Sequence, residues 1–136
     1  MPIVRVTRRV HFSAAHRLDS DRLTPEENAR IYGLCNSPNF HGHNYELDVT
    51  VTGEADENGY VIDLGILRDL VEQSVVRDLD HRNLNSDVEW LQGVIPSSEN
   101  LVVRIWDRLA DRIPNGKLAR LVLWETPRNY VEYTGE

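Results

Sequence analysis

The chain has 136 residues, of which 40% are hydrophobic and 27% charged, and this composition predicts a single globular domain spanning residues 1–136. Its formal net charge of −7 argues against nonspecific binding to nucleic acid or to anionic lipid. No apolar run approaches the ~20 residues of a membrane span, residues 1–5 lack the apolar stretch of a signal peptide, and the single cysteine permits no internal disulfide, so we expect a cytoplasmic protein.

The first part of the chain predicts two strands joined by a connection that contains a short helix. Residues 3–15 are rich in Val and Ile, and their alternation places His16 on the same face as Phe12 and Ala14. A capping box begins at Thr24, with Pro at the first helical position, and this helix should end near Gly33. Residues 42–53 alternate in the same way and form the second strand.

The remaining part predicts two amphipathic helices followed by two strands. Residues 64–79 carry apolar side chains at helical spacing, so we expect a helix there. Another helix begins where Ser97 or Ser98 can serve as its N-cap. Two closing strands then cover residues 117–125 and 129–134.

The order of these elements favours an α+β fold. Strands near both ends of the chain, with helices between them, indicate one four-stranded antiparallel sheet with two long helices on one face. Such a sheet has two open edges, which must be short, charged or paired with another chain. Because the strands are long and rich in valine, we expect the edges to pair and the protein to form a homo-oligomer.

Three histidines form the strongest chemical pattern in the chain. His41 and His43 are two residues apart on a strand, so both imidazoles lie on one face, and Gly42 between them allows close backbone approach. Two converging imidazoles on an apolar face are costly unless a metal or a neutral group lies between them. A third imidazole, from His16 on a neighbouring strand, would complete a metal site with an open fourth position, the arrangement of catalytic zinc.

Cys35 is the only cysteine, and it precedes the pair of histidines by six residues. Three roles suit it: a buried small hydrophobic side chain, a fourth zinc ligand that closes a structural site, or a general base. In the third role, we expect a nearby cation or imidazolium to lower the pKa of the thiol toward neutrality.

Three further groups of polar residues each have two interpretations. Asp80 and His81 follow the first long helix and either cap its end or form a proton relay, because aspartate orients and charges imidazole. Glu125, at the end of a strand, is either an ordinary carboxylate or an acceptor of two parallel N–H donors from a heterocycle. Ser98 and Glu99, at a helix start, suit capping first and ligand contact second.

Six segments spread over nearly the whole chain have a specific order and spacing. They are Phe12–Leu18, Cys35–Tyr45, Leu79–Leu84, Ser97–Asn100, Ile105–Trp106 and Glu125–Thr126. In these segments the chain resembles the 6-pyruvoyl-tetrahydropterin synthase family. The interval of six residues between Cys35 and His41 matches the pyruvoyl-forming branch, whereas the related 6-carboxy-tetrahydropterin synthases typically have an interval of four.

The resemblance implies the tunnelling fold and a metal cofactor. In that fold, an antiparallel sheet with two long helices trimerises into a β-barrel, and two trimers pair as a hexamer. The resemblance also implies one Zn²⁺ per subunit on His16, His41 and His43, which would act as a Lewis acid and template for the substrate.

The resemblance further implies roles for individual residues. Cys35 would be the proton acceptor, with Asp80 and His81 as a relay from an adjacent subunit. The residues that would bind the pterin are Glu125, which anchors the ring, together with Ser97, Ser98 and Glu99.

The family reaction is a lyase step of tetrahydrobiopterin biosynthesis. It converts 7,8-dihydroneopterin triphosphate into 6-pyruvoyl-tetrahydropterin and eliminates triphosphate. An alternative enzyme, 6-carboxy-5,6,7,8-tetrahydropterin synthase of queuosine biosynthesis, uses the same substrate. An alternative of another class is a pterin- or zinc-binding module without turnover, including a structural zinc protein with Cys35 as a ligand.

Overall fold

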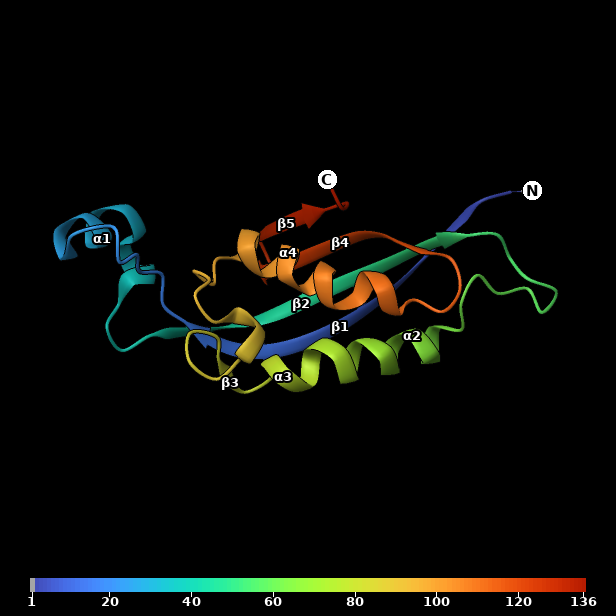
Figure 1. Cartoon of the computed structure of the whole chain (residues 1–136), viewed down its shortest axis with the longest axis horizontal. Helices are drawn as coiled ribbons and strands as arrows, with labels where there is room; N and C mark the ends of the chain where they lie inside the picture. Colours follow the sequence, from blue (N-terminus) through green and yellow to red (C-terminus); the bar gives the residue numbers. More distant parts are fainter. Residues whose placement is uncertain (1) are drawn as a thin grey trace.

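A sheet of five strands runs along the long axis of the molecule (Figure 1). The computed structural model describes residues 2–136. The strands are β1 (Val4–His16), β2 (His41–Gly53), β3 (Arg82–Asn83), β4 (Lys117–Thr126) and β5 (Asn129–Tyr133). Their order in the sheet is β3-β1-β2-β4-β5, and all neighbours are antiparallel except β3, which runs parallel to β1.

The helices occupy the two long connections between strands. In the first connection, α1 (Pro25–Tyr32) and the 3₁₀ turn η1 (Gly33–Asn36) form an arm that projects beyond one end of the sheet (Figure 1). The elements of the second connection are α2 (Leu64–Val71), the π-helical turn η2 (Glu72–Val76), α3 (Arg77–Leu79), η3 (Glu89–Leu91), α4 (Ser98–Leu109) and η4 (Ala110–Arg112). Short β3 lies within this second connection, between α3 and η3.

Polar side chains determine where the helices begin. Thr24 forms the expected capping box, because its Oγ1 accepts from the Glu27 N–H at 3.1 Å and its own N–H donates to Glu27 Oε1 at 2.9 Å. The Ser97 hydroxyl accepts from the Asn100 N–H at 3.2 Å and caps α4, while Asp63 caps α2. Each cap satisfies amide groups that have no partner inside the helix, so the helix begins at that residue.

Alternation along the strands gives the sheet one apolar face and one polar face. On the apolar face, Phe12 of β1 lies opposite Tyr45 of β2, and their rings stack with centroids 4.9 Å apart. On the polar face, Arg9 pairs with Asp48. A slip of one residue would move every apolar side chain to the wrong face, so burial of one face determines the register.

The α2–α3 helix and α4 pack on the apolar face and close the core. The largest side chains that are fully buried between these helices and the sheet are Phe12, Tyr45, Leu47, Leu67, Leu79, Leu101, Ile105, Leu109, Leu121 and Leu123. The predicted α+β class, with two long helices on one face, is therefore confirmed.

Two details differ from the sequence prediction. The sheet has five strands and not four, because β3 pairs with Ala14 and Ala15 over only two residues, which is too short for an alternation pattern. The helix expected over residues 64–79 contains the π-helical turn η2. A π turn inserts one residue into a helix and has no composition of its own, so hydrophobic spacing does not reveal it.

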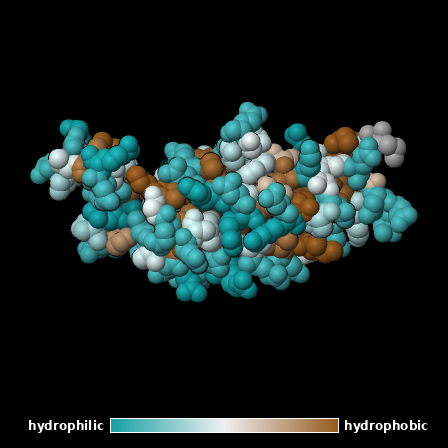
Figure 2. Space-filling model, viewed as in Figure 1, coloured by the Kyte–Doolittle hydropathy of each residue, from teal (hydrophilic) through white to brown (hydrophobic). Residues whose placement is uncertain are grey.

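Apolar side chains remain exposed near both ends of the long axis. In the arm, the Leu34 side chain is 92% exposed, and at the opposite end Ile3 and Ile66 are more than half exposed. Figure 2 shows apolar surface near both ends of a mostly hydrophilic face. Within residues 2–136, no helix combines the length and the apolar character needed to cross a membrane.

Candidate active site

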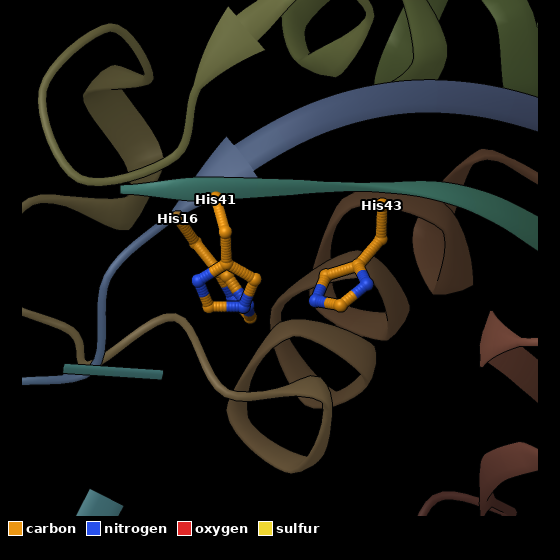
Figure 3. Close-up of side chains that lie close together, drawn as sticks. All are labelled: His16, His41 and His43. Atoms are coloured by element: carbon orange, nitrogen blue, oxygen red, sulfur yellow. The ribbon is translucent and has the colours of Figure 1, made fainter. Parts of the chain in front are cut away.

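Three imidazoles converge at one end of the sheet, on the face that the helices cover (Figure 3). His16 ends β1, and His41 and His43 are the first and third residues of β2. The register pairs His16 with His41 and Ala14 with His43, so all three side chains leave the same face. A Cβ atom at Gly42 would lie 3.3 Å from the Ala14 carbonyl oxygen, so glycine permits this close strand approach. One ligand nitrogen of each histidine lies within 4.8 Å of the others.

The surroundings of this three-histidine group suit a metal ion. His16 is fully buried, and burial lowers the pKa of His16 and of His43, which favours the neutral imidazole that binds metals. The Nε2 atoms of His16 and His41 face each other at 3.2 Å. In the described part of the chain, the buried His41 Nδ1 and His43 Nε2 have no hydrogen-bond partner. Unsatisfied buried nitrogen atoms are costly, so this donor set fits a divalent cation.

The backbone carbonyl of Pro96 orients the ring of His16. His16 Nδ1 lies 2.8 Å from the Pro96 oxygen, which can only accept, so Nδ1 carries the hydrogen and Nε2 is left to bind a metal. The Tyr45 hydroxyl lies 3.4 Å from the same Nδ1. Tyr45 continues the alternation of His41 and His43 along β2, which is a sequence signal for its place in the site. No sequence pattern indicates the Pro96 carbonyl.

Cys35 lies beside the chain segment that follows His16. The Leu18 N–H donates to the Cys35 carbonyl oxygen at 2.7 Å, which holds η1 against the end of β1. The thiol is partly buried and lies outside the group of ligand atoms that are within 4.8 Å of one another. Burial, and then the negative charge of Glu125, raise the pKa of the thiol. This shift is opposite to the one expected from the sequence, because burial is its main cause and the charged group that acts on the thiol within the chain is a carboxylate.

Glu125 connects the three-histidine group to the start of α4. Its Oε1 lies 3.5 Å from His43 Nε2, and its Oε2 accepts a hydrogen bond from the Ser98 hydroxyl at 2.6 Å. Glu125, Ser98 and Glu99 border a cavity of about 210 Å³. A partly sheltered carboxylate beside a small cavity can accept N–H donors from a planar ligand. The hydroxyl oxygen of Ser97, by contrast, is used to cap α4.

Asp80 and His81 contact each other, with His81 Nδ1 at 3.0 Å from Asp80 Oδ2. The backbone of Ser13 holds both residues, because its N–H donates to Asp80 Oδ1 at 2.9 Å and its carbonyl accepts from the His81 N–H at 2.6 Å. The Ser13 hydrogen bond, and secondly His81, lower the pKa of Asp80. The His81 side chain is 82% exposed, and among residues 2–136 it pairs with Asp80 and not with the three-histidine group.

Comparison with known proteins identifies the family. A family model described as 6-pyruvoyl tetrahydropterin synthase matches residues 5–136. The chain belongs to the 6-pyruvoyl tetrahydropterin synthase family. This match spans both strands of the three-histidine group and the strand that carries Glu125.

Two synthases are similar to this chain over nearly their whole length, and an aldolase is similar over most of its length. The human 6-pyruvoyl tetrahydrobiopterin synthase is 45% identical over 133 residues, which cover 97% of this chain and 92% of the human one. The structure of the Caenorhabditis elegans 6-pyruvoyl tetrahydropterin synthase superposes with a TM-score of 0.94 at 40% identity, covering 100% of this chain and 98% of that chain. A dihydroneopterin monophosphate aldolase of Pyrococcus furiosus is 36% identical and covers 89% of each chain.

Membership of the synthase family confirms the family and the enzyme class that the sequence predicted. The fold brings His16, His41 and His43 together and places Glu125 beside them. Asp80 and His81 lie instead along the edge of β1, where Ser13 holds them. The functional roles of these residues remain predictions.

Proposed function

We propose that the chain is a zinc-dependent lyase that converts 7,8-dihydroneopterin triphosphate into 6-pyruvoyl-tetrahydropterin and eliminates triphosphate. The observation that carries this proposal is the three-histidine group beside the Glu125 carboxylate. It occurs in a chain that aligns over 97% of its length with a 6-pyruvoyl tetrahydrobiopterin synthase, which supports the pyruvoyl product. We propose that residues 1–136 act as one catalytic domain.

His16, His41 and His43 would hold the zinc ion, because three converging imidazoles suit this cation, and within residues 2–136 His41 and His43 each have a buried nitrogen atom without a hydrogen-bond partner. When bound, the ion supplies a Lewis acid next to the substrate side chain. The Pro96 carbonyl keeps the hydrogen of His16 on Nδ1, so Nε2 stays available as a ligand. The imidazole ring of His16 cannot flip without breaking this buried hydrogen bond.

Cys35 would remove protons from the substrate side chain and return them. The reaction moves hydrogen between neighbouring carbon atoms without an external electron carrier, so it requires a base that also acts as an acid. Burial raises the pKa of the thiol, so a proton acceptor near it would help it to act as a base. The Asp80–His81 pair suits that task, because the carboxylate orients the imidazole and stabilises its charged form.

Glu125 would anchor the pterin ring by accepting two parallel N–H donors from its aminopyrimidinone edge. The Ser98 hydroxyl donates to one oxygen of this carboxylate, so the carboxylate is already oriented before the ligand binds. Glu125 Oε1 lies 3.5 Å from His43 Nε2, so a pterin ring bound to Glu125 would place the side chain of the pterin near the three histidines. Glu99, which borders the cavity, would contribute a further contact to the pterin, and the Ser97 hydroxyl, whose oxygen caps α4, would contribute one by donating its hydrogen.

The open edges of the sheet support a hexamer built from two trimeric barrels. β3 pairs with β1 only at Ala14 and Ala15, so the β1 edge from Val4 to Phe12 has no strand partner in the described chain. β5 forms the opposite edge of the sheet. Pairing of such edges between copies closes a barrel. It would also bring the exposed His81 of one copy to the site of another, where it can serve Cys35.

The direct test is incubation of the purified protein with 7,8-dihydroneopterin triphosphate, followed by identification of the products by mass spectrometry. We expect 6-pyruvoyl-tetrahydropterin and triphosphate, loss of both on treatment with a chelator, and recovery when zinc is added back. A 6-carboxy product with released acetaldehyde would assign the chain to the carboxy-forming branch. Tight binding of pterin and zinc without release of triphosphate would identify a binding module and refute the proposal.

A further inference from the structure

The helix that leads to Asp80 and His81 changes its hydrogen-bond pattern just before it ends. The π-helical turn η2 (Glu72–Val76) separates α2 from α3, and the Arg77 N–H donates to the Glu72 carbonyl, five residues back. One extra residue in a helix rotates everything after it by about 100°, because each residue turns the helix by that angle. The direction in which Asp80 and His81 leave the helix therefore depends on this turn.

A cluster of side chains holds η2 from outside, and its centre is Arg108 on α4. Arg108 Nε donates to the Ser74 carbonyl oxygen at 3.2 Å, and its Nη2 donates to Asp78 Oδ2 at 3.3 Å. The Trp90 indole N–H donates to the same Asp78 oxygen at 3.0 Å, and the guanidinium lies over the Trp90 ring at 5.1 Å. Arg108, Asp78, Trp90 and the Ser74 carbonyl together form what we call the Arg108 cluster.

The geometry of the Arg108 cluster suits a support for the π turn. Ser74 lies inside η2 and is buried, whereas Asp78 lies in α3, so a single guanidinium bridges the junction between the two helical forms. π-helical turns are rare, occur mostly as single turns inside α-helices, and are frequently found at functional sites. A planar guanidinium donates in two fixed directions at once, which a Lys side chain does not do.

We propose that Arg108 is a positioning residue for the Asp80–His81 pair, and that it acts by holding the π turn in place. The inference rests on the proposed function, in which this pair moves protons. If η2 relaxed to an ordinary α-helix, Asp80 would rotate away from β1. The Ser13 N–H would then lose its acceptor, and His81 would lose the backbone contact that places it along the edge of the strand.

The kinetic test compares Arg108→Ala with Arg104→Ala, an exposed arginine one helical turn earlier on α4. We expect Arg108→Ala to lower kcat for triphosphate release at least about tenfold, with KM and zinc content unchanged, because general acid–base groups typically contribute more than this factor. In an Asp80→Asn background, the same substitution should change kcat by less than about twofold, since residues that act through one another are not additive. Arg104→Ala should have no effect in either background.

A spectroscopic test does not depend on turnover. The Ser13 N–H is protected by Asp80, so its hydrogen exchange measured by NMR should accelerate in Arg108→Ala while the Leu47 amide at the centre of β2 is unchanged. Trp90→Phe removes the indole donor to Asp78, keeps an aromatic ring beside the guanidinium, and should cause a smaller change in the same direction. This milder variant keeps the test decisive if Arg108→Ala folds poorly.

The possible outcomes separate the two proposals. Equal loss of kcat with and without Asp80, loss of zinc, or unchanged Ser13 exchange in the variants would each show that Arg108 has only a structural role. If the wild-type protein releases no triphosphate, the proposed function is wrong, and the exchange of the Ser13 amide still determines whether Arg108 positions Asp80.

Discussion

The Nδ1–H of His16 donates to the backbone carbonyl of Pro96 across 2.8 Å in the protein interior. This hydrogen bond determines which nitrogen of His16, the buried candidate metal ligand, carries the hydrogen. Its acceptor lies in the loop that immediately precedes α4. Ser98, the first residue of α4 and two positions after Pro96, reaches Glu125 through its hydroxyl. One short segment therefore orients a metal ligand and the carboxylate beside it, so the metal and pterin sites should respond together to changes in this loop.

The first prediction concerns metal content. His43→Ala removes one of three ligand nitrogen atoms, and zinc bound by two imidazoles is held far more weakly. We expect about one zinc per chain in the wild type and less than about one-tenth in the variant, measured by plasma mass spectrometry after dialysis. His11→Ala is the matched control, because His11 is an exposed histidine on the opposite face of β1. Equal metal content in the two variants would refute the site.

The second prediction separates the roles of Cys35. Cys35→Ala should abolish triphosphate release while zinc stays at about one per chain, because the thiol lies outside the three-histidine group. The measurement is turnover and metal content on the same sample. If zinc falls together with activity, the thiol is a ligand and the site is a structural one.

The third prediction concerns Ser98, which donates to Glu125 Oε2 at 2.6 Å. Hydrogen bonds to charged groups contribute about 1.5–3 kcal/mol, and water replaces part of this at a partly exposed carboxylate. Ser98→Ala should therefore weaken the binding of 7,8-dihydroneopterin about fivefold, or about 1 kcal/mol, with zinc content unchanged. Glu125→Ala should weaken it more. Ser86→Ala, which removes an exposed hydroxyl, serves as the control for Ser98→Ala. Normal pterin binding by Glu125→Ala would refute the anchoring role of Glu125.

Much of the fold could be predicted because its main elements carry strong local signals. The alternation in β1 and β2 reflects burial of one face, and this pattern alone suffices to put His16, His41 and His43 on that face. The capping box at Thr24 predicted the start of α1. These features depend on neighbouring residues in the sequence, so periodicity and capping rules detect them.

The features that could not be predicted depend on residues far apart in the sequence. The bond from His16 to Pro96 joins positions 80 residues apart, and an ordinary carbonyl supplies it. The turn η2 is held by Arg108, 34 residues beyond Ser74. The pKa of Cys35 depends on burial and on Glu125, which the fold brings near, so its direction could not be inferred from neighbouring residues.

The fourth prediction concerns stability on the polar face of the sheet. Asp48 accepts hydrogen bonds from Arg9 Nε at 2.6 Å and from Arg9 Nη2 at 2.9 Å, and a longer one from the Trp124 indole at 3.4 Å. The Arg9 hydrogen bonds are the main cause of the lowered pKa of Asp48. Because the folded protein releases this proton more readily than the unfolded chain, the ionised carboxylate stabilises the fold above the unfolded pKa of about 3.9. That stabilisation is lost as the pH falls through the lower folded pKa.

Asp48→Asn mimics the protonated carboxyl, so the variant should lack, at every pH, the stabilisation that the wild type loses in acid. We expect it to lower the free energy of unfolding by about 0.5–1 kcal/mol at pH 7, because solvent screens the exposed Arg9. Urea unfolding at a series of pH values should show a difference in the free energy of unfolding between the wild type and Asp48→Asn. This difference should be constant between about pH 7 and 5 and shrink below about pH 4. Asp107→Asn, at an exposed position on α4, is the control. A difference that persists undiminished at about pH 2 would show that Asp48 stabilises the sheet by packing and not by its charge.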